Sequence, residues 1–130
     1  MILQTTLSLA AAAAIINLWL SIRVGALRRA HGLSHGDGGI AAIAQRMRAH
    51  LNFAENAPLV LILIGVIELT GKGGQWLAIV GALFMLARLA HAIGMDKANG
   101  SPLRATGAVV TMLTLLGLAV VAVLIALGRI

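Results

Sequence analysis

The chain of 130 residues is 60% hydrophobic and 11% charged, with a mean hydropathy of +0.99. Soluble domains are about half apolar, so this composition excludes an ordinary soluble domain and predicts an integral membrane protein. The absence of cysteine excludes a disulfide framework, a thiolate metal site and a nucleophilic cysteine.

The first predicted transmembrane helix covers residues 2–26. Its apolar stretch is longer than the roughly 7 to 15 residues of a signal-peptide core, and no basic segment precedes it, so we interpret it as a retained span. Its alanines permit close contact between helices in lipid. In the connection that follows, His31 and His35 lie four residues apart, but the segment is too rich in glycine to predict a metal site.

The second predicted span, residues 45–70, begins with the unusually polar stretch "RMRAHLNFAENAPL". On a helix, Gln45, Arg48, Asn52 and Glu55 share one face. An acid inside the membrane boundary needs a partner, which is either Arg48 or the ammonium group of a ligand. Two interpretations therefore stay open: an Arg–Glu pair that only joins helices, or a ligand site, which the accompanying amides favour.

Two further residues of this span carry predictions. Pro58 removes one backbone hydrogen bond and should bend the helix. Glu68 precedes the turn "TGKGG", so we expect it to reach water beside Lys72 in an interfacial or packing role rather than in catalysis.

The third and fourth predicted spans are residues 75–95 and 105–127. In the third, Arg88 and His91 are spaced i, i+3 and face the same way. Each also has a simple structural explanation, because Arg88 could extend to the membrane surface and His91 could be a hydrogen-bonded packing residue. Since lipid offers no partner to free backbone groups, the four spans predict one all-α domain over residues 1–130.

The basic residues predict the orientation of this bundle. Eight of the ten Lys and Arg lie in or beside the first and third connections: Arg23, Arg28, Arg29, Arg46, Arg48, Arg88, Lys97 and Arg104. The positive-inside rule then predicts that these two connections are cytoplasmic and that both termini lie outside. The same rule explains the net charge of +6 without a nucleic-acid partner.

Three segments resemble one protein family. "RAHLNFAENAPL" resembles the second-helix signature R-A-x-x-N-x-x-E-x-x-P-L of the MAPEG family, the membrane-associated proteins in eicosanoid and glutathione metabolism, and it fits without a gap from Arg48 to Leu59. "ALRRAHG" resembles the basic end of that family's first helix, and "ARLAHAIG" resembles its third-helix pattern A-R-x-x-[YH]-x-x-G. The chain is most similar to the short bacterial members, which implies the bacterial inner membrane.

The resemblance implies a homotrimer of four-helix subunits that binds glutathione, as co-substrate, between subunits near the cytoplasmic side. It implies a glutathione transferase or peroxidase that acts on lipophilic electrophiles or lipid hydroperoxides. The binding residues implied by matching positions are Arg28, Arg29, Arg48, His50, Asn52, Glu55, Arg88 and His91.

The resemblance also implies a catalytic residue, and the chain departs from the eukaryotic pattern near it. Arg104 is the counterpart of the arginine that stabilises the glutathione thiolate, reached through a two-residue insertion. Tyrosines of the eukaryotic enzymes are replaced by Asn56, His91 and Met95.

Two other functions are compatible with parts of the sequence. Four short spans with an intramembrane Glu also suit a small cation or multidrug transporter, but the first span has no acid and only 3% of the residues are aromatic. A non-catalytic membrane protein that keeps the MAPEG fold is the other alternative. Thiol-dependent turnover separates the enzyme from both.

Overall fold

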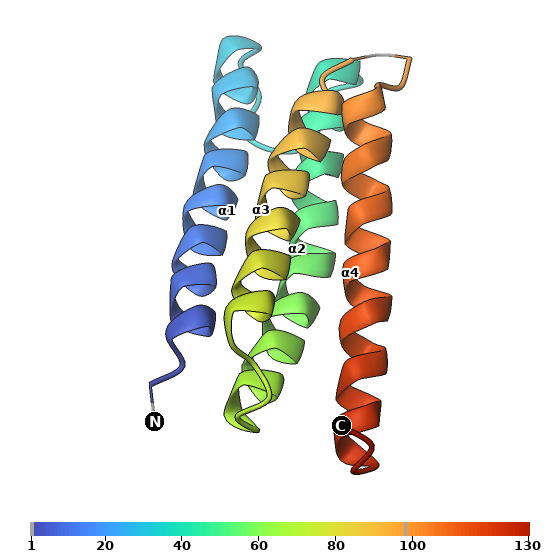
Figure 1. The fold of residues 1–130 in the computed structure, drawn as a ribbon. Helices are drawn as coiled ribbons and strands as arrows, with labels where there is room; N and C mark the ends of the chain where they lie inside the picture. The colour runs from blue at the N-terminus through green and yellow to red at the C-terminus, as the bar shows by residue number, and fades with distance from the viewer. Residues whose placement is uncertain (1, 98) are drawn as a thin grey trace.

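The computed structural model describes residues 2–97 and 99–130, and within these ranges the chain forms four long α-helices (Figure 1). These are α1 (Gln4–Ala30), α2 (Ala41–Leu69), α3 (Gln75–Gly94) and α4 (Pro102–Ala126). Each helix is long and apolar enough to cross a membrane. The prediction of an all-α membrane bundle is therefore confirmed.

Several helix ends lie outside the predicted spans. Hydropathy detects the part of a helix that crosses the hydrocarbon core, whereas backbone hydrogen bonding continues past it: α1 runs to Ala30, and α2 begins at Ala41. In α4 the helix begins at Pro102, because the Ser101 hydroxyl accepts from the Leu103 amide at 3.2 Å and proline is compatible with the first helical turn. Pro58 lies inside α2 without ending it.

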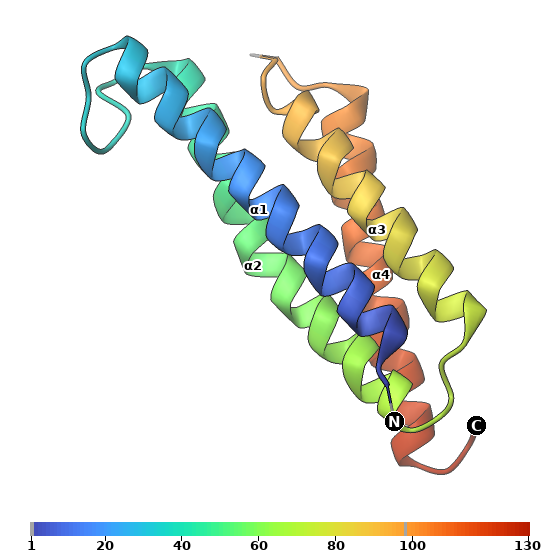
Figure 2. The ribbon, with the colours of Figure 1, turned by 90° about the vertical axis from the view of Figure 1, so that its left-hand side faces the viewer.

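The four helices form two antiparallel pairs, α1 with α2 and α3 with α4 (Figures 1 and 2). Both chain ends lie at one end of the bundle, and the first and third connections lie at the other (Figure 1). Over the described ranges α1 and α4 do not contact each other. Figure 2 shows the two pairs spreading apart towards the end that carries the first and third connections.

Apolar side chains form the interior of the subunit and also cover most of its outside. The interior includes Leu20, Val60, Ile64, Ile67, Leu77 and Phe84, each no more than 2% exposed. Large apolar side chains such as Ile15, Ile62, Leu83, Met112 and Leu116 are more than half exposed. Such an extensive apolar surface is expected where lipid or another subunit, rather than water, surrounds the helices.

Helices α3 and α4 approach closely because two glycines lie between them. A Cβ atom added to Gly107 would lie 2.5 Å from the carbonyl oxygen of Ala87 and 2.6 Å from Cβ of His91. A Cβ atom added to Gly94 would lie 2.3 Å from the backbone nitrogen of Arg104. These contacts, which only glycine permits, hold the start of α4 directly against the end of α3.

The carboxylate of Glu68 caps the first helix. It accepts hydrogen bonds from the backbone amides of Thr5 and Thr6, both at 2.8 Å, and from the Thr6 hydroxyl at 2.6 Å. The amides of a first helical turn have no partner within their own helix, so an acid placed there satisfies them and complements the helix dipole. The carboxylate is directed to α1 and forms no ion pair with Lys72 in the described ranges, so Glu68 has a packing role, as predicted, through a partner that was not predicted.

Candidate functional site

Arg88 of α3 is the largest polar side chain inside the bundle, with 1% of its surface exposed. Its guanidinium donates to the Thr111 hydroxyl of α4 at 2.8 Å and to the side-chain oxygen of Asn52 on α2. It also lies 3.3 Å from Nδ1 of His91, one turn further along α3. The spacing of Arg88 and His91 thus places both on one face, as predicted, and Arg88 links three helices.

The environment of this arginine is neutral. Asn52, His91 and Thr111 contribute an amide, an imidazole and a hydroxyl, and no carboxylate pairs with Arg88 in the described ranges. The Nε–H group is buried and has no hydrogen-bond partner there. A buried cation without a counter-ion is costly, and an anion near this point would lower that cost. The interior of the bundle therefore favours negative charge at this level.

Arg48 and Glu55 lie on α2, to either side of Asn52, and both are exposed on the surface of the subunit. Neither joins an ion pair within residues 2–97 and 99–130. Within the described part of a single subunit, Arg48 and Glu55 therefore do not form the ion pair that would join helices. The two charges are about 10 Å apart along the axis, at 1.5 Å per residue.

The depth of these two charges follows from the length of α2. Its 29 residues span about 43 Å, whereas the hydrocarbon core is about 30 Å thick. If Leu69 marks the far membrane surface, Arg48 falls near the opposite surface and Glu55 falls inside the core. An exposed carboxylate at that depth requires a partner from outside the subunit.

Arg28 and His50 line a separate groove of about 420 Å³ between α1 and α2. Arg28 Nε donates to the carbonyl oxygen of Gly36 at 2.9 Å, and His50 Nε2 lies 2.8 Å from the side-chain oxygen of Asn17. Ser21, Val24, Gly25, Met47, Leu51 and Ala54 complete the lining. Arg29, the neighbour of Arg28, is exposed outside this groove.

Arg104 lies in the first turn of α4 and is exposed. Its backbone packs on Gly94, and a Cβ atom on Gly100 would lie 3.7 Å from its Nη2 atom. The side chain therefore extends beside the α3–α4 connection. Of the nine residues that the sequence proposes, the subunit joins Asn52, Arg88 and His91 directly and leaves the others in the groove or on the surface.

Two residues that bond the predicted site residues, Thr111 and Asn17, were not predicted from the sequence. Thr111 was hidden within an apolar span, and its own hydroxyl also donates to the Gly107 carbonyl at 2.8 Å, which is common for threonine in helices. Asn17 was a stronger signal, because an isolated amide in an apolar span generally has a hydrogen-bond partner. That partner, His50, lies 33 residues away in the sequence.

The family model described as the MAPEG family matches residues 6–124. This range runs from the first turn of α1 into the last turn of α4 and includes all three connections. No curated protein matches the chain significantly.

Proposed function

We propose that this chain, which belongs to the MAPEG family, is a glutathione-dependent membrane transferase or peroxidase for lipophilic electrophiles or lipid hydroperoxides. One observation carries the proposal: Arg48 and Glu55 lie on the surface to either side of Asn52 and have no ion-pair partner among the described residues, while the Asn52 amide is fixed by the buried Arg88. Arg48, Asn52 and Glu55 therefore form a polar line along α2, and a ligand with separated charges of both signs would pair with its two charged residues.

The chemistry of the line suits glutathione. Glutathione carries two carboxylates, one ammonium and one thiol. Arg48 can hold a carboxylate through two parallel hydrogen bonds, and Glu55 can accept from the ammonium. Because the Asn52 oxygen already accepts from Arg88, its NH₂ group is the part left to donate to the peptide.

The outward position of the charges supports a site between subunits. In a homotrimer, a neighbouring subunit would cover Arg48 and Glu55 and shield them from lipid, which would hold the ligand in a low-dielectric cleft. Arg28 and His50 line a groove on the same subunit and would contribute to the corresponding face of the neighbouring site. The assembly is part of the proposal.

Arg104 would act on the sulfur. A thiol is a poor nucleophile until it ionises, and a nearby guanidinium stabilises the thiolate form. The side chain is exposed at the start of α4 and is therefore accessible to a ligand. The thiolate would then displace the leaving group of a lipophilic electrophile. Alternatively, it would reduce a hydroperoxide to the alcohol and water, with a second glutathione completing the disulfide. Both kinds of substrate would arrive through the lipid bilayer. We place this chemistry on the cytoplasmic side of a bacterial inner membrane.

Calorimetry of glutathione binding to the purified protein tests the site. Arg48→Ala and Glu55→Gln should each weaken binding by at least about tenfold, because loss of one partner strands a charge away from bulk water. Arg129→Ala removes a cation beyond the other end of α4 and serves as the control. Unchanged affinity in both site variants, with the assembly intact, would eliminate the glutathione site.

Turnover assays test the chemistry. An aryl halide and a lipid hydroperoxide distinguish transferase from peroxidase activity, and absence of thiol-dependent turnover with both would favour a non-catalytic protein or a transporter. Arg104→Ala should slow turnover while binding stays close to normal. Equal loss of binding and turnover in Arg104→Ala would instead make Arg104 a binding residue.

A further inference from the structure

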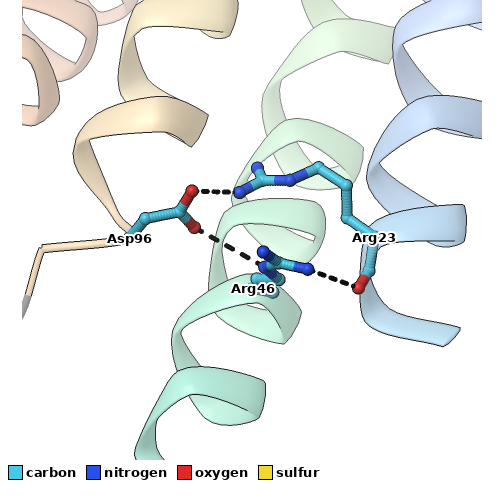
Figure 3. Close-up of polar contacts among 3 residues, drawn as sticks. All are labelled: Arg23, Arg46 and Asp96. Atoms are coloured by element: carbon cyan, nitrogen blue, oxygen red, sulfur yellow. Dashed lines mark hydrogen bonds and ion pairs between the residues drawn. The ribbon is translucent and has the colours of Figure 1, made fainter. Parts of the chain in front are cut away.

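Three charged side chains meet where the α3–α4 connection passes α1 and α2 (Figure 3). Asp96 accepts from Arg23 of α1, and its second oxygen lies 3.8 Å from Nε of Arg46 on α2. Arg46 also donates to the carbonyl oxygen of Arg23 at 2.9 Å. We name Arg23, Arg46 and Asp96 the Asp96 clamp.

The Asp96 clamp joins the two helix pairs where they spread apart (Figures 2 and 3). The contacts of Asp96 with Arg23 and Arg46 are the two ion pairs found in the described parts of the chain. The Arg23 side chain is only 12% exposed and its guanidinium lies 4.7 Å from the centre of the Trp19 ring, so it is held on both sides. A single exposed ion pair contributes little, but two arginines and one aromatic ring form a network.

The Asp96 clamp is linked to Arg104 through a short path. Asp96 lies just past Gly94, the last residue of α3, and Gly94 packs against the backbone of Arg104. The connection then returns to Ser101, which caps the helix that carries Arg104. A displacement of Asp96 would therefore be transmitted to the first turn of α4, since both ends of this connection are packed.

We propose that Asp96 is a positioning residue: by holding the α3–α4 connection against α1 and α2, it fixes the first turn of α4 and the direction of the Arg104 side chain. The effect on chemistry rests on the proposed function of Arg104, whereas the mechanical effect does not. Asp96 itself contacts no reacting group.

Amide hydrogen exchange in detergent micelles tests the mechanical effect. In Asp96→Asn, the amides of residues 99–105 should exchange roughly fivefold faster, because loss of the network eases local opening. Asp37→Asn removes the same charge from the first connection and should leave these amides unchanged. The double variant Asp96→Arg with Arg23→Asp restores an ion pair of reversed polarity and should recover slow exchange. Unchanged exchange in Asp96→Asn would overturn the proposal.

A double-mutant cycle with Arg104 tests the effect on chemistry. Asp96→Asn should lower kcat roughly fivefold with little change in the KM for glutathione, and it should have no further effect in the Arg104→Ala background. Additive losses would show that Asp96 does not act through Arg104. If wild-type protein neither binds nor uses glutathione, the proposed function fails, while the exchange experiment still decides whether Asp96 positions the start of α4.

Discussion

Replacing Thr111 by valine removes the hydroxyl that accepts from Arg88 and keeps the shape of the side chain. The chain provides a matched control in Thr114, also on α4 and also buried. Both hydroxyls donate to the carbonyl four residues earlier, Thr111 to Gly107 at 2.8 Å and Thr114 to Val110 at 2.7 Å. Only Thr111 also accepts from Arg88, so the difference between the two variants isolates that bond.

The expected magnitude follows from two ranges. Hydrogen bonds between transmembrane helices average about 0.6 kcal/mol and reach about 1.7 kcal/mol, while hydrogen bonds to charged groups contribute about 1.5–3 kcal/mol in soluble proteins. Arg88 is charged and already has one buried N–H without a partner. Loss of the Thr111 acceptor would leave a second N–H without one, so we expect an energy cost where the two ranges meet. We expect Thr111→Val to lower the free energy of unfolding by about 1.5 kcal/mol more than Thr114→Val does.

The assay is unfolding in mixed micelles with increasing denaturing detergent, followed by tryptophan fluorescence at a fixed protein concentration. The fixed concentration matters because an oligomer's stability depends on it. Thr111→Ser should restore most of the loss, since it keeps the acceptor. If Thr111→Val and Thr114→Val unfold within about 0.5 kcal/mol of each other, the additivity error of such comparisons, the Arg88–Thr111 bond does not stabilise the bundle.

Three further perturbations have defined outcomes. Glu68→Gln should destabilise the bundle by about 1–2 kcal/mol, because glutamine keeps only one of the two acceptor oxygens of this helix cap and removes its charge. Exchange of the Thr5 and Thr6 amides should become faster while glutathione affinity stays unchanged. Loss of affinity in an intact assembly would contradict this role. Gly107→Ala should lower the free energy of unfolding by about 1–3 kcal/mol through overpacking. Gly117→Ala is the control and should be neutral or stabilising, because nothing lies within 4 Å of the added Cβ atom. Equal unfolding midpoints of the two variants would count against close α3–α4 packing. Reporter fusions should place the C-terminus outside, because most of the Lys and Arg residues lie in or beside the first and third connections. A reporter found in the cytoplasm would reverse the proposed orientation.

The helices were predictable because hydropathy and length alone define a membrane span. The shared face of Arg88 and His91 was predictable for a similar reason, since a helix fixes which residues lie one turn apart. The end of α1 and the start of α2 were less predictable. Backbone hydrogen bonding continues there into the polar membrane surface, where hydropathy gives no signal.

The partners of polar residues could not be predicted, because they depend on contacts between distant segments. Glu68 has Lys72 four positions away, yet it bonds Thr5 and Thr6, more than sixty positions away. Asp96 was one residue of an unremarkable loop until the fold brought Arg23 and Arg46 beside it. Arg48, Glu55 and Arg104 remain predicted site residues, since their ligands would lie outside a single subunit.

The cap on α1 also bears on the order in which the protein assembles. The amides of Thr5 and Thr6 enter the membrane without an acceptor of their own, and the carboxylate that receives them lies 62 and 63 residues further along the chain. During synthesis these amides therefore depend on water or lipid headgroups until nearly all of α2 has been made. We expect α1 and α2 to become joined as a hairpin once Glu68 has been added to the chain.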